Sequence, residues 1–318
     1  MTHKKILITG GSGQVAGPAV EALVGEHEVW CLGRFSDPEA ERSLTTLGAR
    51  TVKWDMGKDS LEGVPDDFTH VIHSAVHRGD GKDFQATVEI NGGGAARLMT
   101  HCRKAKAFLY ISTGAVYARN PDQEHFYAET DPLGGHAPWL PTYPLGKISG
   151  EAVVRALAIT LGVPTTIARL NVAYGPRGHG GMPILLFRRM LAGEPVAVPR
   201  QGQNRCNLLH TDDVVRQIPL LWDVASVPTR VVNWGHDEAV GVSDMLRYMS
   251  EITRIEAKLE PSDFSRETIA FDNAVRERLI GRCEVDWREG LRRTLEDFFP
   301  GIVKTALVAN SYQSTAAK

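Results

Sequence analysis

The first fifteen residues constrain the fold more than any other part of the chain. A short apolar run at residues 6–8 breaks into the turn Thr9-Gly-Gly-Ser-Gly13, and a stretch with one apolar helical face follows. In this order, glycines let the backbone turn sharply beside a pyrophosphate, and the new helix points its free N–H groups at that anion. Glycine also serves ordinary turns, so the turn alone is weak evidence. Its place at the start of a chain with alternating strand and helix patterns favours dinucleotide binding.

Composition limits the class of protein. The 318 residues are enough for one large domain, or for a nucleotide-binding domain with a smaller lobe. The formal charge of −2 argues against nucleic acid or an anionic membrane as a partner. The four cysteines lie far apart with no CxxC pair, as expected for free thiols in a reducing compartment. No apolar run reaches the roughly 18–20 residues of a membrane span and no signal-peptide core precedes the first strand, so we expect a soluble cytoplasmic protein.

Strand and helix patterns alternate through the first half of the chain. Short apolar runs predict buried strands at residues 4–9, 28–33, 50–54, 70–73, 107–112 and 165–170. Helical patterns fill residues 15–25, 38–47, 84–104 and 144–161. Strands separated by helices indicate βαβ units, and the right-handed crossover rule leaves few topologies for them. The predicted fold is α/β, a doubly wound parallel sheet of the Rossmann type.

The pattern loosens after Gly175, where a Gly-rich loop follows. Beyond it, helices are predicted at residues 183–193, 243–255 and 288–298, and short strands at 195–198 and 231–234. We expect residues 1–175 to form the dinucleotide-binding domain, with residues 208–235 returning to it. The remaining predicted parts are a smaller C-terminal substrate-binding lobe at residues 176–207 and 236–300, and a loose tail at residues 301–318.

A tyrosine and a lysine four residues apart, Tyr143 and Lys147, form the second informative pattern. On a helix they share one face, so the phenol and the ammonium can serve one site. A nearby cation lowers the pKa of a tyrosine, which lets Tyr143 exchange a proton with an alcohol or a ketone. Pro144 suits the first helical turn, where its missing N–H costs nothing. The spacing also arises by chance and is weak evidence alone.

A predicted strand runs into two hydroxyl side chains, Ser112 and Thr113. In an open parallel sheet, ligands collect at the carboxyl ends of the strands, where these side chains emerge. A hydroxyl at that place can hydrogen-bond a substrate carbonyl. The alternative is a Ser/Thr turn, in which the hydroxyl caps its own backbone.

Together these residues resemble the extended short-chain dehydrogenase/reductase family, which includes the sugar-nucleotide epimerases and dehydratases. The resemblance runs in the expected order to about residue 299, although Ala16 stands where the family usually has a third glycine. The other matching motifs are Asp55-Met56, Ser74-Ala75 after the fourth predicted strand, Asn91 with Gly94, Arg169, Tyr174-Gly-Pro176 and His210-Thr-Asp-Asp213.

The resemblance implies a role for each catalytic residue. Tyr143 is the general acid/base, Lys147 lowers its pKa and bonds the nicotinamide ribose, and Thr113 polarises the reacting oxygen. A hydride moves between the nicotinamide and a substrate carbon, so the cofactor carries the chemistry. The implied cofactor contacts are Gly10, Gly13, Gln14, Val15, Arg34, Asp55 (similar to the aspartate that holds the adenine), Met56, Ser74, Ala75, Asn91, Tyr143, Lys147 and Val172.

The end of the second predicted strand bears on the choice of cofactor. An acidic residue about twenty positions beyond the glycine turn holds the adenosine ribose 2′-hydroxyl and favours NAD. Gly33 stands at that place, and Arg34 follows with a guanidinium that suits a 2′-phosphate. Ser36 adds a hydroxyl. We therefore expect NADP(H) to be favoured, with NAD(H) as the alternative if Arg34 stacks on adenine or points into water.

Departures from the sugar-nucleotide pattern concern the substrate. The dehydratases carry Thr-Asp-Glu at the hydroxyl site, whereas this chain has Thr113-Gly-Ala, so sugar 4,6-dehydration is not expected. The epimerases place an asparagine and an arginine along the substrate, and here Asn171 and Arg205 each stand one residue early. On an extended segment that displacement turns a side chain to the other face, which weakens the nucleotide-sugar interpretation unless a loop compensates.

Three further residues are weaker candidates for substrate contacts. Tyr117 and Trp139 either line an apolar pocket, which suits a small hydrophobic ketone or aldehyde, or simply pack as core residues. His179 lies in the Gly-rich loop, which is either a substrate lid or a flexible connection. No metal site is expected, because their spacing puts His70 and His73 on opposite faces of a strand.

The leading hypothesis is an NADP(H)-dependent oxidoreductase that converts a carbonyl of a small molecule to an alcohol. The alternative is a nucleotide-sugar epimerase with a tightly bound NAD(P), which oxidises a sugar carbon and reduces it again from the other face. A third hypothesis, a non-catalytic NADP(H) sensor, has no need for the intact set of Thr113, Tyr143 and Lys147. The resemblance also implies a homodimer through residues 84–104 and 144–161, because the family commonly pairs two helices of each subunit.

Overall fold

The computed structural model describes residues 3–137, 140–263 and 267–304. Its centre is a sheet of seven parallel strands in the order β12-β7-β5-β4-β1-β2-β3. These strands are β1 (Lys5–Thr9), β2 (Glu28–Gly33), β3 (Arg50–Lys53), β4 (His70–His73), β5 (Ala107–Thr113), β7 (Thr165–Leu170) and β12 (Arg230–Trp234). The chain order reverses beside β1, as in a doubly wound Rossmann sheet, so the predicted fold class is confirmed.

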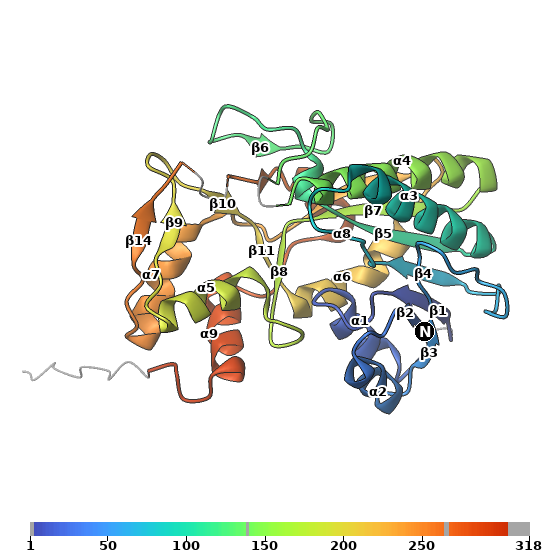
Figure 1. Cartoon of the computed structure of the whole chain (residues 1–318), viewed down its shortest axis with the longest axis horizontal. Coiled ribbons are helices and arrows are strands. Elements are labelled where there is room, and N and C mark those ends of the chain that lie inside the picture. Colours follow the sequence, from blue (N-terminus) through green and yellow to red (C-terminus); the bar gives the residue numbers. More distant parts are fainter. Residues whose placement is uncertain (1–2, 138–139, 264–266, 305–318) are drawn as a thin grey trace, which may run out of the picture.

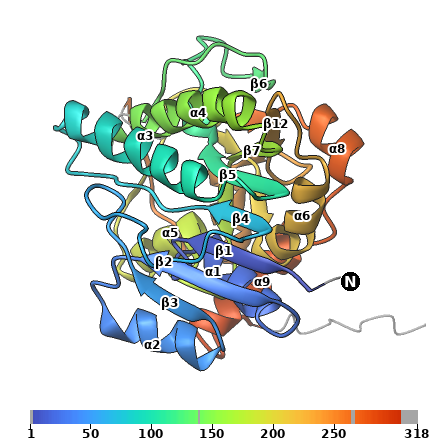
Figure 2. The same ribbon diagram turned by 90° about the vertical axis from the view of Figure 1, so that its right-hand side faces the viewer.

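Helices cover both faces of the sheet (Figure 2). The two on one face, α3 (Phe84–His101) and α4 (Thr142–Leu161), lie side by side. The opposite face is covered by α1 (Ala16–Leu23), α2 (Pro38–Thr46), α6 (Thr211–Asp223) and α8 (Ala274–Ile280). Strands covered on both faces are largely apolar, which explains the short apolar runs in β1, β4 and β5, whereas the edge strand β3 is partly exposed.

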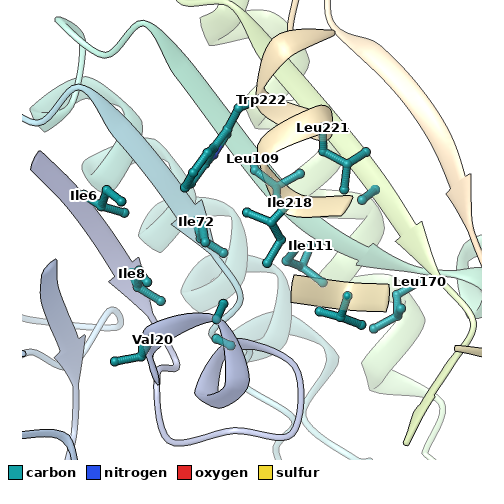
Figure 3. Close-up of a cluster of buried hydrophobic side chains, with 14 of the residues drawn as sticks. Ile6, Ile8, Val20, Ile72, Leu109, Ile111, Leu170, Ile218, Leu221 and Trp222 are labelled. Carbon is teal, nitrogen blue, oxygen red and sulfur yellow. The ribbon is translucent and has the colours of Figure 1, made fainter. Parts of the chain in front are cut away.

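Alternate residues of β1 show how the two faces are filled. Leu7 packs beneath α3 and α4, whereas Ile6 and Ile8 point to the other face, and all three side chains are fully buried. The cluster around Ile6 and Ile8 brings in Val20, Ile72, Leu109, Ile111, Leu170, Ile218, Leu221 and Trp222 (Figure 3). Burying each aliphatic side chain of this size stabilises the fold by about 1.5–3 kcal/mol relative to exposure.

A second group of elements lies beside the sheet, at the left of Figure 1. Its helices are α5 (Gly181–Leu191), α7 (Val242–Thr253) and α9 (Trp287–Phe298), which share a core around Ile184, Phe187, Leu246 and Leu291. Its strands pair as β9 (Val196–Val198) with β14 (Leu259–Pro261), and β10 (Arg205–Cys206) with β13 (Val240–Gly241). Linking pairs are β8 (Val172–Tyr174) with β11 (Leu208–His210), and β6 (Phe126–Tyr127) with β15 (Ala270–Phe271).

Helix α6 is not predicted by the sequence pattern. The helix contains Pro219, which reads as a helix breaker, although His210 caps its first turn by accepting from the N–H of Asp212. Its apolar face, including Ile218 and Trp222, closes the core on the α1 side of the sheet. Helix α8 is also not predicted, and of the short strands outside the main sheet only β9 is predicted; the ends of the other predicted elements differ from the observed ones by at most a few residues. Within the described ranges, no helix has both the length and the apolar character needed to cross a bilayer.

Candidate active site

A cavity of about 510 Å³ opens where the parallel strands end. The turn after β1 lines it, and at Gly10 the backbone has a φ of +73°, which favours glycine. A Cβ there would lie 3.0 Å from the backbone nitrogen of Ala75, so only glycine lets the two loops approach this closely. No side chain caps the start of α1, so this helix end is open to an anion, although the N–H of Gly17 already donates to the carbonyl of Gly13 and Pro18 has no N–H. These features fit the pyrophosphate of a dinucleotide.

We call this the first cavity, and one of its ends is bordered by the end of β2 and the residues that follow it. Gly33, Arg34 and Ser36 all line it. Arg34 is exposed and forms no ion pair with any carboxylate of the described residues. Asp37 also lines the cavity, but its carboxylate caps α2 by accepting from the N–H of Glu39 at 2.9 Å. This end therefore offers an unpaired guanidinium beside a hydroxyl.

Tyr143 lines both the first cavity and a second cavity of about 620 Å³. It lies in the first turn of α4, one turn before the buried Lys147, whose Nζ donates to the carbonyl of Ile111 at 2.7 Å. Burial, assisted by the charge of Arg78, lowers the pKa of Lys147 to about 7. The guanidinium carbon of Arg78 lies 5.4 Å from the centroid of the Tyr143 ring. Two basic side chains, Arg78 and Lys147, therefore lie near the phenol of Tyr143.

Thr113 lies at the end of β5 and lines the second cavity. Its Oγ1 accepts from the N–H of Ala115 at 3.2 Å, so the capping role weighed above does occur. A hydroxyl that accepts one bond still has its proton to donate. Thr113 can therefore cap the short 3₁₀ turn Gly114–Val116 and also donate to a ligand.

A buried ion pair lies beneath the two cavities. Glu151 of α4 accepts from Nε and Nη2 of Arg169 on β7, at 3.0 and 2.8 Å. Ser112, which lines the first cavity, donates its hydroxyl to the same carboxylate at 2.5 Å. The contact ties the ends of β5 and β7 to α4, the helix that carries Tyr143.

Most of the predicted cofactor contacts line the first cavity. These are Gly10, Gly13, Gln14, Val15, Arg34, Asp55, Met56, Ser74, Ala75, Tyr143 and Lys147. Val172 instead lines the second cavity. Asn91 is buried behind the loop after β4, where its amide exchanges hydrogen bonds with the backbone N–H and C=O of His77, at 2.9 and 3.0 Å. Asn91 therefore positions that loop.

The predicted substrate contacts divide into two groups. Asn171 and His179 line the second cavity. Tyr117 instead packs in the core, stacked on Tyr127, with its hydroxyl 2.5 Å from Oδ1 of Asn233. Arg205 points toward Glu124 and pairs with its carboxylate. The fifth prediction, Trp139, lies outside the described residues.

Among the residues of the second cavity that were not predicted as contacts, three are polar side chains from separate loops. Arg78 follows β4 and lines both cavities. His136 carries an Nε2 that lies 2.5 Å from Oε2 of Glu267. Asn204 precedes β10. They come from separate loops, so no local spacing in the sequence marks them as one site.

The histidines of β4 point apart, as their spacing predicts. His70 packs on Trp222 of α6, and His73 packs on Tyr110 and bonds Thr9 through Nδ1 at 2.7 Å. Burial lowers the pKa of both imidazoles, to about 4 and about 3. Across the described ranges, no group of three or more His, Cys, Asp or Glu residues is arranged to hold a metal ion.

A family model described as "NAD dependent epimerase/dehydratase family" matches residues 6–235. The chain is 24% identical over 277 residues to an uncharacterized UDP-glucose epimerase, YtcB, of Bacillus subtilis (strain 168), covering 81% of this chain and 85% of that protein. It is 23% identical over 322 residues to UDP-N-acetyl-alpha-D-glucosaminuronate decarboxylase of Bacillus cytotoxicus, covering 93% and 98% of the two chains.

The solved structures include a close match in fold. The UDP-glucuronic acid 4-epimerase of Bacillus cereus, in complex with UDP-glucuronic acid and NAD, superposes with a TM-score of 0.77. The sequence identity is 21%, and the match covers 92% of this chain and 98% of the epimerase.

Proposed function

Since the chain belongs to the NAD dependent epimerase/dehydratase family, and is thus an enzyme of the extended short-chain dehydrogenase/reductase type, we propose that it is an NADP(H)-dependent oxidoreductase. It moves a hydride between the nicotinamide and a carbonyl or alcohol carbon of a small molecule. The first cavity holds the cofactor. The second cavity holds the substrate, and it is lined both by residues 1–175 and by the lobe of residues 176–207 and 236–300.

The position of Tyr143 carries this proposal, because its side chain lines both cavities. A bound nicotinamide supplies or accepts the hydride. Tyr143 holds a proton on its Oη and gives it to the substrate oxygen, while Thr113 donates a hydrogen bond to the same oxygen. Lys147 lies one turn away, and in its protonated form it stabilises the phenolate that remains.

The test of this proposal is Tyr143→Phe, measured by the absorbance of reduced nicotinamide across a panel of carbonyl compounds and sugar nucleotides. Loss of the general acid should lower turnover by about 10²–10⁴-fold, with cofactor affinity retained. Tyr248→Phe is the matched control, since Tyr248 packs on Trp287 in the lobe core. Full activity in the Tyr143 variant would overturn the proposal.

The preference for NADP(H) rests on Arg34, which stands exposed and unpaired among the described residues at the cavity edge. A guanidinium binds a 2′-phosphate by charge-assisted hydrogen bonds. Arg34→Ala should therefore weaken NADPH binding by roughly tenfold or more and leave NADH binding unchanged. Titration calorimetry measures both affinities. The preference would be contradicted if Arg34→Ala left the ratio of the NADPH and NADH affinities unchanged, or if the wild type bound NADH more tightly than NADPH. The comparison is needed because similar proteins of known structure were solved in complex with NAD.

A nucleotide-sugar epimerase is the second candidate, and unpaired amide groups favour it. Gln14 Nε2, Asn171 Oδ1 and both amide atoms of Asn204 are buried without a partner among the described residues, and all three side chains line the second cavity. Amides of this kind suit the hydroxyls of a sugar. An epimerase must also keep its cofactor through each turnover, so retention of the nucleotide distinguishes the two candidates.

We further propose a homodimer through α3 and α4. Phe84, Val88 and Ile159 on these helices are exposed large apolar side chains, 49%, 38% and 63% accessible. A surface of this kind is typical of a helix-pair interface. Light scattering should give twice the mass of the chain, and Ile159→Glu should give monomers.

A further inference from the structure

Asn204 is a buried side chain whose amide has no hydrogen-bond partner among the described residues. The residue is 2% exposed, and both Nδ2 and Oδ1 are buried and unpaired. An unpaired buried donor or acceptor is unfavourable, and native proteins keep few of them. Asn204 has two on one side chain, so an ordinary packing role does not account for it.

The backbone around Asn204 is fixed on both sides. The carbonyl of Asn204 accepts from the N–H of Val242 at 2.9 Å, and the N–H of Arg205 donates to Oγ1 of Thr268 at 3.2 Å. Strand β10 begins at the next residue and pairs with β13. The backbone on both sides of Asn204 is therefore fixed, which also fixes the position of its side-chain amide.

Asn207, three residues further on, is a buried asparagine whose side-chain amide is fully hydrogen-bonded, and it serves as a comparison for Asn204. It is fully buried, and its Nδ2 donates to the carbonyl of His236 at 2.8 Å. Its Oδ1 accepts from the N–H of Phe271 at 2.9 Å and from Asn171 at 3.2 Å. The same chain thus satisfies one buried amide completely and leaves its neighbour unpaired.

Asn204 lies where two cavities meet. It lines the second cavity together with Tyr143, and also a third cavity of about 410 Å³ that is bordered mainly by polar side chains. The guanidinium groups of Arg119 and Arg200 border the third cavity, but each is paired with a carboxylate, Glu267 and Asp263, at 3.1 Å. Asn204 is therefore a neutral, unengaged hydrogen-bonding group at the junction.

We propose that Asn204 is a specificity-determining residue that binds the part of the substrate lying away from the reacting carbon. Its carboxamide presents a donor and an acceptor side by side, so it matches a group with a neighbouring acceptor and donor. Two sources supply that chemistry, a pair of adjacent sugar hydroxyls and the imide edge of a pyrimidine. The inference rests on the proposed function, since it takes the second cavity as the substrate site.

The first test compares the stability of Asn204→Leu with that of Asn207→Leu by thermal unfolding of the full chain. Leucine has the branched shape of asparagine and brings no polar atoms. Asn204→Leu should unfold at the same temperature as the wild type or higher. Asn207→Leu should unfold at a lower one, because it removes three hydrogen bonds, including the bond that the N–H of Phe271 donates. Alanine at both positions repeats the comparison without added volume. An equal fall in melting temperature for the two sites would overturn the proposal.

The second test measures binding of UDP-glucose, uridine and glucose 1-phosphate to cofactor-saturated protein by calorimetry. Asn204→Leu should weaken UDP-glucose by roughly tenfold or more, and the fragment that weakens with it identifies the sugar or the base as the bound group. Unchanged affinity in the variant would overturn the proposal. If the wild type binds none of the three, the stability comparison decides alone. Neither test needs turnover, so a failure of Tyr143 as acid/base is detected separately.

Discussion

Replacing Glu151 by glutamine removes the counter-ion of a buried arginine. Glu151 and Arg169 are each 1% exposed and lie 2.8 Å apart, with Ser112 bonded to the same carboxylate. Burial disfavours the charged form of Arg169, but its hydrogen bonds and attraction to Glu151 outweigh this and raise its pKa. The buried charge is therefore stable only while Glu151 is ionised.

The size of the effect follows from that geometry. Breaking a buried ion pair by removing one partner costs about 3–5 kcal/mol. Glutamine keeps the shape and one acceptor oxygen, so we expect the lower end, about 3 kcal/mol. Domains are stable by about 5–15 kcal/mol, which makes this a large fraction of the total. The double variant Glu151→Leu with Arg169→Met should be more stable than Glu151→Leu alone, because it leaves no unpaired charge.

Urea unfolding followed by tryptophan fluorescence measures these differences. Glu289→Gln is the matched control, since Glu289 pairs with Arg292 at 2.7 Å but the two side chains are 50% and 44% exposed. Exposed pairs contribute about 0–1 kcal/mol. A loss at Glu151 no larger than that at Glu289 would refute the reasoning.

Two further predictions concern the helix that carries Tyr143. Gly150→Ala should lower the melting temperature, because a Cβ would lie 2.0 Å from the hydroxyl of Tyr110, whereas Gly25→Ala, which meets nothing within 4 Å, should not. Lys147→Met should flatten the dependence of stability on pH. Burial lowers the folded pKa of Lys147 to about 7, whereas an unfolded lysine keeps its proton to about 10.4, so the wild type gains stability as pH rises between these values. Urea unfolding across this range checks it, and equal slopes for the two proteins would contradict it.

Local patterns explain which parts of the molecule the sequence predicts. The strands Glu28–Gly33 and Thr165–Leu170 begin and end where predicted, because most of their residues are apolar or β-branched, as expected for strands covered on both faces. Tyr143 and Lys147 fall one turn apart on α4, as their spacing requires. Helix α6 escaped prediction because Pro219 interrupts its pattern, while the core contacts that stabilise the helix come from distant strands.

Contacts between distant segments explain what the sequence does not predict. From the sequence, Tyr117 is either a substrate contact or a core residue, and its place in the core depends on a hydroxyl that bonds Asn233, 116 residues away. Arg205 pairs with Glu124, 81 residues away. Asn204 cannot be identified as a candidate from the sequence, because the observation that marks it is the absence of a hydrogen-bond partner for its buried amide among the described residues. These contacts form only when distant segments of the chain fold together, so no local spacing in the sequence predicts them.

An oxidoreductase of the proposed kind exchanges NADP(H) with solution in each turnover. The most direct measurement is to denature freshly purified protein, identify and quantify any nucleotide released, and then titrate the empty protein with NADPH and NADH. We predict little released nucleotide and tighter binding of NADPH. One equivalent of NAD⁺ retained per chain would contradict the claim and would favour the epimerase.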